Sequence, residues 1–364
     1  MNRSCVFLLL YSLTACTSTP RSESENNEFY SLDDFGQVEK VDTHVHIRTE
    51  RDAFVEQARK DNFKLVTIVV DHSDGREDVR EQFNYCMQQA NDHSDAIACI
   101  TAFSAKEWDE PDWAQQSLQW LDSCFAAGAI GIKVWKNIGM VQRDQAGELV
   151  IVDDPKLDTI FAVLANREIP VIGHLGEPKN CWLPVEEMTT NNDKGYFTNN
   201  PQYHMYKHPE MPSYEEQIAA RDRMLEKNPE LTFIGAHMGS LEWSVDELAK
   251  RLDQFANMSV DLSARMGQIF YQTRENREKV RDFFIQYQDR LLYGTDMGDD
   301  GDGSKEALQQ GMHSTWLRDW KYFVTDETMT SDLIEGEFQG LQLPREVIDK
   351  IYHKNAQIWF GIFK

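Results

Sequence analysis

The sequence predicts an α/β fold, a (β/α)8 barrel of parallel strands with two long loops inserted at the carboxyl ends of its strands. Eight short runs rich in β-branched and other apolar residues alternate with amphipathic helical stretches. Apolar strands that are each followed by a helix are typical of a parallel sheet with both faces covered. With 364 residues, the chain is long enough for such a barrel and its insertions. An open, doubly wound sheet is the alternative, but the glycine-rich phosphate turn that usually follows its first strand is absent from this sequence.

The predicted elements follow one another in strict alternation. The strands are expected at residues 38–47, 64–72, 96–103, 129–135, 169–175, 231–238, 257–263 and 290–297. The helices between them are expected at residues 53–60, 76–90, 113–125, 156–167, 214–227 and 241–255. The two insertions, at about residues 176–212 and 298–343, follow the fifth and eighth strands. They leave the end of the barrel at which enzymes of this architecture build their active sites.

Composition and charge argue against one class of partner, nucleic acids. An apolar content of 41% and a charged content of 27% are those of a soluble globular protein. The formal charge of −24 argues against a nucleic acid partner, because a phosphate backbone is bound by lysine and arginine. We therefore expect a small-molecule substrate, and the sequence leaves a homo-oligomer open.

The first residues resemble a bacterial lipoprotein signal peptide. Arg3 precedes an apolar run, Val6–Leu13, which is too short to span a bilayer stably. The tetrad LTAC ends at Cys16, and a polar stretch follows it. We expect residues 1–15 to be the signal peptide, residues 16–38 a lipidated cysteine with a flexible tether, and residues 39–364 a single barrel domain. The protein would then be exported and anchored to a membrane that faces the periplasm or the cell surface. An ordinary secretory signal, in which Cys16 has no special role, is the alternative.

Four further cysteines lie in the expected mature domain: Cys86, Cys99, Cys124 and Cys181. An exported protein can form disulfides, but the spacing of these residues matches no zinc pattern and a large domain does not need cross-links. We therefore predict buried free thiols rather than disulfides.

The stretch VDTHVHI, residues 41–47, places two histidines two positions apart in the first strand. Alternate residues of a strand point to the same face. Asp42, His44 and His46 are therefore expected to share one side of the strand.

Three later strands also end in polar residues, namely His174 in the fifth, His237 in the sixth and Asp296 in the eighth. A single strand-end histidine is usually structural, but all of these groups should meet at one rim of the barrel. Neutral imidazoles and a carboxylate are the ligands of a zinc-type catalytic site with an open position.

The fourth strand contributes a lysine. In residues 129–135 the apolar side chains alternate toward the helices, so Gly131, Lys133 and Trp135 should face the barrel interior and Lys136 should point away from it. A lysine inside a barrel must shift its pKa, form an ion pair or be modified, because an unpaired buried ammonium is costly.

This set of residues resembles the amidohydrolase superfamily of metal-dependent barrel hydrolases. The sequences GHLGEP, FIGAHMGS, NMSVDLSAR and QDRLLYGTDMG are similar to the branch that includes aminocarboxymuconate-semialdehyde decarboxylase. The resemblance covers about residues 39–361. It implies that His44, His46 and Asp296 bind a divalent metal, with zinc expected and His174 as a fourth ligand. His237 would hold the attacking water or contact a second metal, and Asp296 would also carry the proton.

The resemblance leaves the role of Lys133 open. In binuclear members a strand-four lysine is carboxylated and bridges two metals, whereas a single metal is more usual in this branch. We favour one metal, with Lys133 holding a substrate carboxylate or a developing oxyanion as a cation.

Arg265 would clamp an anionic substrate at the rim or form a salt bridge at a helix start, and Trp135 would line the pocket.

Three functions are compatible with these residues. The first is a metal-dependent hydrolase that activates water to cleave a cyclic amide, lactone or ester bond of a small molecule. The second uses the same ligands for nonoxidative decarboxylation of an aromatic or unsaturated carboxylic acid. The third is a non-catalytic surface binding lipoprotein, which we expect to have lost at least one ligand, whereas this sequence retains all of them.

Overall fold

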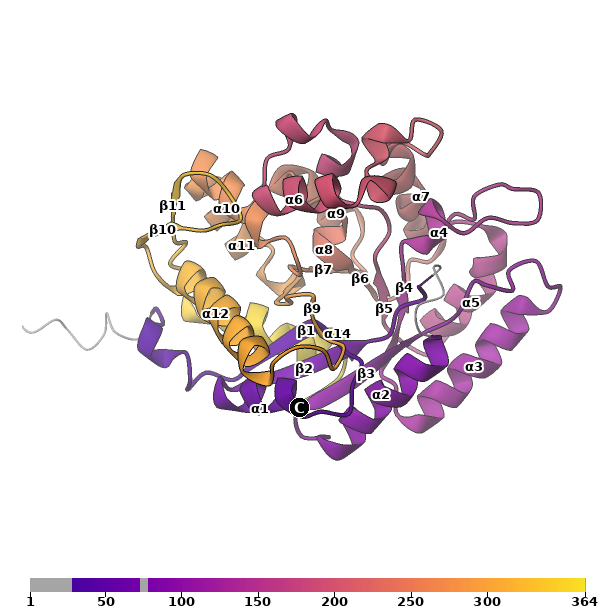
Figure 1. The fold of residues 1–364 in the computed structure, drawn as a ribbon, viewed down its shortest axis with the longest axis horizontal. Helices are drawn as coiled ribbons and strands as arrows, with labels where there is room; N and C mark the ends of the chain where they lie inside the picture. The colour runs from indigo at the N-terminus through magenta and orange to yellow at the C-terminus, as the bar shows by residue number, and fades with distance from the viewer. Residues whose placement is uncertain (1–27, 73–77, 364) are drawn as a thin grey trace, which may run out of the picture.

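The computed structural model describes residues 28–72 and 78–363 and places nine short strands in one parallel sheet (Figure 1). The strand order is β8-β7-β6-β5-β4-β3-β2-β1-β9. Both edge strands belong to residues 291–299, since Leu291–Leu292 (β8) pairs with β7 and Met297–Asp299 (β9) pairs with β1. This segment links the two edges of the sheet, so the predicted barrel class is confirmed.

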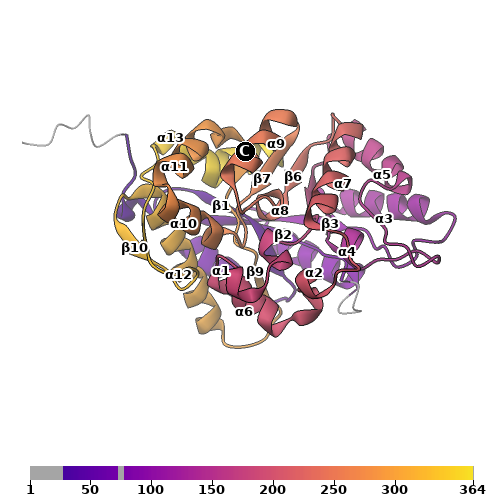
Figure 2. The same ribbon diagram turned by 90° about the horizontal axis from the view of Figure 1, so that it is seen from above.

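The bounds of the barrel elements agree closely with the sequence pattern. The first seven strands are Lys40–Ile47 (β1), Phe63–Ile68 (β2), Ile97–Ala102 (β3), Gly131–Val134 (β4), Val171–Gly173 (β5), Phe233–Gly235 (β6) and Met258–Asp261 (β7). The helices that follow the first six strands are Ala53–Lys60 (α1), Val79–Asp92 (α2), Trp113–Ala127 (α3), Pro155–Asn166 (α5), Tyr214–Lys227 (α7) and Val245–Gln254 (α9). Seen from above, helices flank the strands on both sides (Figure 2).

Two further helices, Met266–Glu275 (α10) and Arg277–Gln286 (α11), lie between β7 and β8, and the sequence pattern did not single them out. The second insertion is more ordered than a loop. It contains a long helix, Lys305–Val324 (α12), and an antiparallel pair, Thr328–Thr330 (β10) and Glu337–Gln339 (β11). Trp316 and Trp320 of α12 are fully buried, so this helix covers the barrel wall in the place of an eighth helix.

The first insertion lies above strands β5 to β7 in Figure 1 and holds the helix Asn191–Asn199 (α6). It ends where α7 begins, at a capping box in which Ser213 and Glu216 satisfy each other's backbone N–H groups. Smaller helical segments are Asn137–Met140 (α4) after β4, Ala236–Gly239 (α8) after β6, and Arg345–Asp349 (α13) and Asn355–Trp359 (α14) near the C-terminus.

Strand β1 contains a bulge that corrects one prediction. Asp42 pairs with Leu65 and Val45 pairs with Thr67, so β1 has one residue more than β2 over this interval. The bulge reverses the alternation of side chains. As a result Asp42 faces outward and accepts a hydrogen bond from the indole of Trp316 at 2.9 Å, rather than sharing a face with the two histidines.

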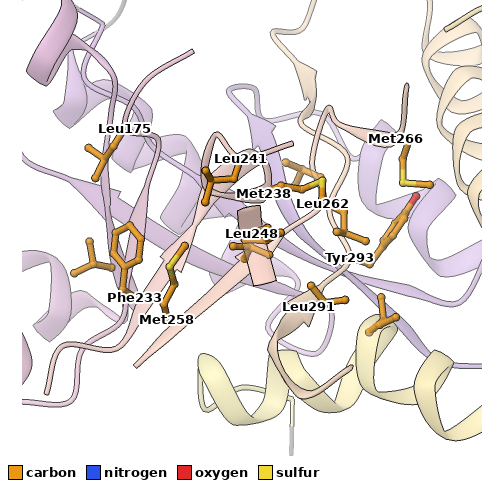
Figure 3. Close-up of a cluster of buried hydrophobic side chains, with 14 of the residues drawn as sticks. Leu175, Phe233, Met238, Leu241, Leu248, Met258, Leu262, Met266, Leu291 and Tyr293 are labelled. Carbon is orange, nitrogen blue, oxygen red and sulfur yellow. The ribbon is translucent and has the colours of Figure 1, made fainter. Parts of the chain in front are cut away.

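Two apolar clusters fix the barrel. One gathers strand residues from around the barrel and the C-terminal Phe360, and it fills the interior at the end opposite the polar rim: Val41, Val66, Ile68, Ile100, Ile172, Ile234 and Leu292. The other lies largely between strands and helices, and Figure 3 shows part of it around Phe233, Met258 and Leu291. Each fully buried side chain of this size contributes roughly 1.5–3 kcal/mol to stability.

Residues 28–38 pack onto the barrel instead of forming the end of a tether. Phe29 forms a β-bridge with Pro344, Ser31 accepts a hydrogen bond from the indole of Trp320, and Phe35 is buried in the core. The ordered domain therefore begins before the expected boundary at residue 39. The predicted signal peptide, Cys16 and the tether up to residue 27 lie outside the described residues. In the two described ranges, no helix combines the length and the apolar character needed to cross a membrane.

The prediction of four free thiols is wrong for two of them. Cys86 on α2 and Cys99 on β3 form a disulfide, with their Cα atoms 5.6 Å apart. The reason is tertiary, because α2 packs on β3 and brings the two residues within bonding distance, which their spacing along the chain does not reveal. Cys124 and Cys181 are buried free thiols, as predicted.

Candidate metal centre and active site

The five predicted metal ligands line one cavity of about 240 Å³ at the carboxyl ends of the strands. They come from β1, from the residues that follow β5 and β6, and from the bend between β8 and β9. The cavity is lined by His44, His46, His174, His237 and Asp296 together with Lys133, Trp135, Arg48, Val70, His72 and Lys136. The structure thus brings together all the predicted catalytic, pocket and metal-binding residues except Arg265.

The bend at Asp296 explains why the eighth strand is split. Asp296 has a φ of 68°, in the left-handed region that a strand cannot continue through. Its N–H donates to the carbonyl of His44 at 2.8 Å. The preceding Thr295 donates from both its N–H and its hydroxyl to Asp42, whose carboxylate also holds Trp316. The outward-facing Asp42 therefore fixes the turn that aims Asp296 into the cavity.

Hydrogen bonds on the far side of three rings fix their tautomers. His44 Nδ1 lies 2.8 Å from the carboxylate of Asp261, and His46 Nδ1 lies 2.8 Å from the carbonyl of Ile68. His237 Nδ1 lies 2.9 Å from the carbonyl of Ser263. These oxygens only accept, so each Nδ1 donates and each Nε2 of a neutral ring presents a lone pair. Such outer hydrogen bonds orient histidines that bind metals.

The lone pairs meet the carboxylate of Asp296. His46 Nε2 lies 3.0 Å and His44 Nε2 lies 3.4 Å from Oδ1 of Asp296. A carboxylate oxygen also only accepts, so these groups repel unless a proton or a cation lies between them. His44, His46 and Asp296 each offer one atom within 4.8 Å of the others, a separation that can enclose a metal ion. The donor set of two imidazoles and a carboxylate fits a divalent cation.

His174 adds a further unpaired nitrogen. Its ring lies 4.2 Å from that of His237, and its Nε2 is buried without a hydrogen-bond partner among the described residues. Burial, followed by the nearby positive charges, lowers the pKa of His174 well below its usual value. Burial is also the main cause that lowers the pKa of His237. Both rings are therefore neutral at pH 7, which is the form that binds metals.

Burial and the neighbouring imidazoles have opposite effects on the pKa of Asp296. Burial alone would raise the pKa of this carboxyl group, but the imidazoles of His237, His46 and His44 hold it well below its ordinary value. Asp261 behaves in the same way, because its contacts with His44 outweigh the effect of burial on its pKa. Both groups are carboxylates at pH 7, and they supply negative charge beside and behind the ring nitrogens.

Lys133 lies inside the barrel, as predicted, with a relative exposure of 2%. Its Nζ is 3.1 Å from His44 Nε2, to which it donates. Burial lowers the pKa of Lys133 to about 8, although Asp261 and Asp296 oppose this effect.

Trp135 also faces the cavity, where its ring meets that of His72 in an edge contact with centroids 4.9 Å apart. Its predicted position is confirmed.

The expectation for Lys136 is wrong. Strand β4 ends at Val134, so the alternation does not continue to residue 136, and the side chain enters the cavity. There Lys136 forms an ion pair with the buried carboxylate of Glu177. Glu177 also lies 3.9 Å from His174 Nε2.

Arg265 is buried next to the cavity without lining it. Its Nη1 donates to the carbonyl of Ala264, and its Nε has no hydrogen-bond partner among the described residues. Its charge contributes to the low pKa of both His174 and His237. The predicted salt bridge at the start of α10 is not formed among the described residues, and the charge of Arg265 also lowers the pKa of the buried Glu242.

Sequence reasoning missed several residues of the site. Asp261 at the end of β7 and Ser263 just after it support His44 and His237, and the signal for them is the alternation in NMSVDLS. Glu177 follows His174 in GHLGEP, but no local pattern indicates its ion pair with Lys136. His72, four residues after the end of β2, also lines the cavity, and the sequence analysis did not assign it to the site.

Comparisons with known proteins agree with this geometry. A family model described as Amidohydrolase matches residues 41–362. An uncharacterized TIM-barrel protein from Bordetella bronchiseptica is 14% identical with a TM-score of 0.50, over 89% of this chain and 99% of its own. A 2,6-dihydroxybenzoate decarboxylase from Rhizobium is 13% identical with a TM-score of 0.52, over 89% and 98% of the two chains. A search of curated proteins gives no match.

A third solved structure is of a dihydroxybenzoic acid decarboxylase from a Polaromonas species, with bound manganese and the inhibitor 2-nitroresorcinol. It is 13% identical with a TM-score of 0.53, over 90% of this chain and 98% of its own. At these identities the structural matches show a shared fold.

Proposed function

Because the chain belongs to the amidohydrolase family, we propose that it is a metal-dependent enzyme acting on a small carboxylic acid. The proposed reaction is nonoxidative decarboxylation of an aromatic or unsaturated acid. We propose one divalent cation, bound by His44, His46 and Asp296 with His174 as the fourth ligand. Zinc suits the imidazoles, and manganese suits the carboxylate and is present in the Polaromonas decarboxylase.

One observation carries the choice of substrate. The cavity is small, about 240 Å³, and combines the aromatic wall of Trp135 and His72 with the ammonium of Lys133. Lys136 and Arg48 also line it, but their charges are matched by Glu177 and Asp300. Among the described residues no carboxylate lies within ion-pair distance of Lys133, so its charge is available to an acidic substrate. A flat ring with a carboxylate fits this combination.

The solved neighbours add weight to decarboxylation over hydrolysis. Two of the similar structures are decarboxylases of dihydroxybenzoic acids, one of them with manganese and a nitroresorcinol. These are properties of those proteins, and their low identity makes them support for the proposal rather than its basis.

The residues of this chain divide the proposed reaction among themselves. Trp135 orients the ring, and Lys133 holds the carboxylate. Asp296, a carboxylate at pH 7, would take a proton from solvent and pass it to the ring carbon that bears the substrate carboxylate. The carbon–carbon bond then breaks, its electron pair restores the ring as carbon dioxide leaves, and Asp296 is again a carboxylate, so one proton is consumed for each carbon dioxide released. A bound cation supplies Lewis-acid polarisation of the substrate oxygens.

Hydrolysis of a lactone, cyclic amide or ester is the second candidate, and one feature favours it. The unprotonated Nε2 of His237 belongs to a ring that the carbonyl of Ser263 holds in place at the cavity wall. That nitrogen is an acceptor for a water molecule, and Asp296 would take its proton. In this case Lys133 would stabilise the developing oxyanion.

Product analysis of the metal-loaded chain tests these proposals. Wild type is incubated with 2,6-dihydroxybenzoate and, separately, with a lactone and an ester panel. Release of carbon dioxide that is lost in Asp296→Asn, and kept in the exposed control Asp122→Asn, supports decarboxylation. Turnover of lactones alone would replace it by hydrolysis. If wild type and Asp296→Asn are equally inert on every substrate of the panel, the result contradicts decarboxylation and favours a non-catalytic binding protein.

We also propose that the chain is exported and anchored through a lipid on Cys16. This rests on the sequence alone, from the LTAC tetrad and the polar stretch after it. Expression in a bacterial host with labelled palmitate tests it. Label on wild type that is absent from Cys16→Ala, with release of the variant from the membrane fraction, supports the proposal, and an unlabelled wild type contradicts it.

A further inference from the structure

A second cavity lies beside the candidate active site and outside the barrel. Its volume is about 700 Å³, within the range of roughly 300–1,000 Å³ that is typical of small-molecule sites. It is bounded by the first turns of α7, by the loop that follows β4, and by Leu175 and Gly176 after β5. The same two segments also border the first cavity, which is lined by Trp135, Lys136 and His174.

The second cavity contains an unpaired buried carboxamide. Gln217 on α7 has a relative exposure of 8%, and both its Oε1 and its Nε2 lack hydrogen-bond partners among the described residues. A buried amide without partners is destabilising, so the site gains when something supplies them. Gly176 leaves the space for this group. A Cβ at that position would lie 2.9 Å from Gln217 Oε1, on a backbone with a φ of 104° that disfavours other residues.

The other walls are mostly apolar. The side chains that form them are Ile138, Leu149, Ile151, Val152, Leu175 and Met211. An apolar wall with one convergent polar group is the usual form of a specific small-molecule site.

The charges at the rim disfavour an anion. Arg143 and Arg223 line the cavity, but Arg223 donates to Asp153 at 2.6 Å and Arg143 donates to the carbonyl of Gly147 at 2.7 Å. Three carboxylates line the same cavity: Glu148, Glu210 and Glu216. The three carboxylates outnumber the two arginines, and the charge of Arg223 is already matched by Asp153, so a neutral ligand fits better than a carboxylate.

We propose that this second cavity binds a neutral ring compound that carries an amide edge, with a hydrogen-bond donor next to an acceptor. That edge pairs with the carboxamide of Gln217, whose acceptor and donor lie side by side in the complementary order. The ring lies on the apolar wall. The site is separate from the proposed catalytic centre, and it reaches that centre through Leu175 and Gly176, which directly follow His174.

Benzamide is the probe that tests this site. Binding to the full metal-loaded chain is measured by isothermal titration calorimetry and by ligand-observed NMR. A fragment of this size binds with a Kd on the order of 1 mM. We expect saturable binding of benzamide, at least roughly tenfold weaker binding of acetophenone, which lacks the donor, and weaker binding of benzoate because of the rim carboxylates.

Two variants and a matched control locate the binding. Gln217→Leu should weaken benzamide binding roughly tenfold by removing both hydrogen-bonding atoms. Ala219→Trp, at a half-buried position on the same wall, should abolish binding by filling the cavity. Gln254→Leu, an exposed glutamine on α9, should bind as wild type does.

Three outcomes overturn the proposal: no saturable binding of benzamide to wild type, equal binding to wild type and Gln217→Leu, or binding that survives Ala219→Trp. The last two place the probe in the catalytic cavity or on the surface. Circular dichroism of each variant establishes that it is folded. Because the measurement is of binding, failure here leaves the proposed decarboxylation standing, and failure of the decarboxylation assay leaves this site standing.

Discussion

The two neighbouring cavities differ in how their polar groups are held. In the catalytic cavity, His44, His46 and His237 each donate a hydrogen bond on the outer side, so their inner nitrogens are fixed as acceptors. In the second cavity, Gln217 is not held by any described side chain or backbone group at either end of its amide. Acceptor nitrogens that converge on a carboxylate favour a cation, which at His44 is the ammonium of Lys133 and in the proposed enzyme is a metal ion. An unpaired donor and acceptor favour a neutral amide instead.

An unpaired buried polar atom indicates which ligand a site can bind when the partners of the other polar atoms in the same side chain are known. For the histidines, the outer partner removes the tautomer ambiguity and leaves one chemistry for the inner nitrogen. For Gln217 both atoms remain open, and the surrounding charges decide against an anion.

The largest effect is expected from removing a proposed ligand. His44→Ala or His46→Ala should lower metal affinity by more than about 100-fold, beyond the loss typical of outer-shell partners, and should abolish turnover. The fold should persist, because the interior cluster around Val41 and Ile172 does not include these residues. Metal content by inductively coupled plasma spectrometry and circular dichroism measure the two effects. His93→Ala, on the far end of α2, is the control, and full metal retention in His44→Ala would contradict the site.

A smaller loss of metal affinity is expected when the carboxylate of Asp261, which lies behind the ring of His44, is neutralised. Asp261→Asn keeps the shape but removes the charge that orients His44 Nδ1, so metal affinity should fall about 10- to 100-fold. Competition with a coloured chelator measures it. Asp253→Asn, at an exposed position, should leave the affinity unchanged, and an Asp261→Asn variant that binds as tightly as wild type would contradict the role of Asp261.

A third test concerns a buried carboxyl group outside the proposed metal cluster. Burial is the main cause that raises the pKa of Glu242 to about 7, and its Oε2 lacks a partner among the described residues. The folded chain therefore holds this proton better than the unfolded chain does, so Glu242 stabilises the fold at low pH and loses that effect as pH rises through about 7.

Relative to wild type, Glu242→Gln should therefore gain roughly 2 kcal/mol in free energy of unfolding between pH 5 and pH 8. Urea unfolding at both pH values measures the difference. Glu226→Gln, at an exposed position on α7, should show no such change with pH. A constant difference between Glu242→Gln and wild type would contradict the raised pKa.

The smallest change in stability is expected at the second cavity, in the chain without a bound ligand. Gln217→Leu removes a buried amide that lacks partners, so it should raise the free energy of unfolding by about 1 kcal/mol or leave it unchanged. Thermal and urea unfolding measure it against Gln254→Leu. A loss of more than about 2 kcal/mol would mean that the carboxamide already has partners in the protein.

Most of the barrel was predictable because its signals are local. Apolar runs and helical spacing located the first seven strands and the helices that follow the first six, and α1 and α7 begin and end where the pattern predicts. The bulge in β1 and the split of the eighth strand were not predictable, since both depend on Asp42 meeting Thr295 and Trp316 from distant parts of the chain. The Cys86–Cys99 disulfide was missed for the same reason.

The candidate site was predictable to a similar degree. Strand ends indicated His174, His237 and Asp296, because parallel strands end at one rim. The supporting groups Asp261 and Glu177 were missed, since their roles exist only through contacts made after folding. The second cavity is formed by three segments that are far apart in the sequence, and no pattern along the chain marks Gln217.

An anomalous-scattering map from a crystal of the metal-loaded chain tests the central claim most directly. The account predicts one peak, within bonding distance of His44 Nε2, His46 Nε2 and Asp296 Oδ1. Two peaks bridged by a modified Lys133 would replace the single ion by a binuclear centre. A fully loaded crystal with no peak among these three atoms would contradict the account.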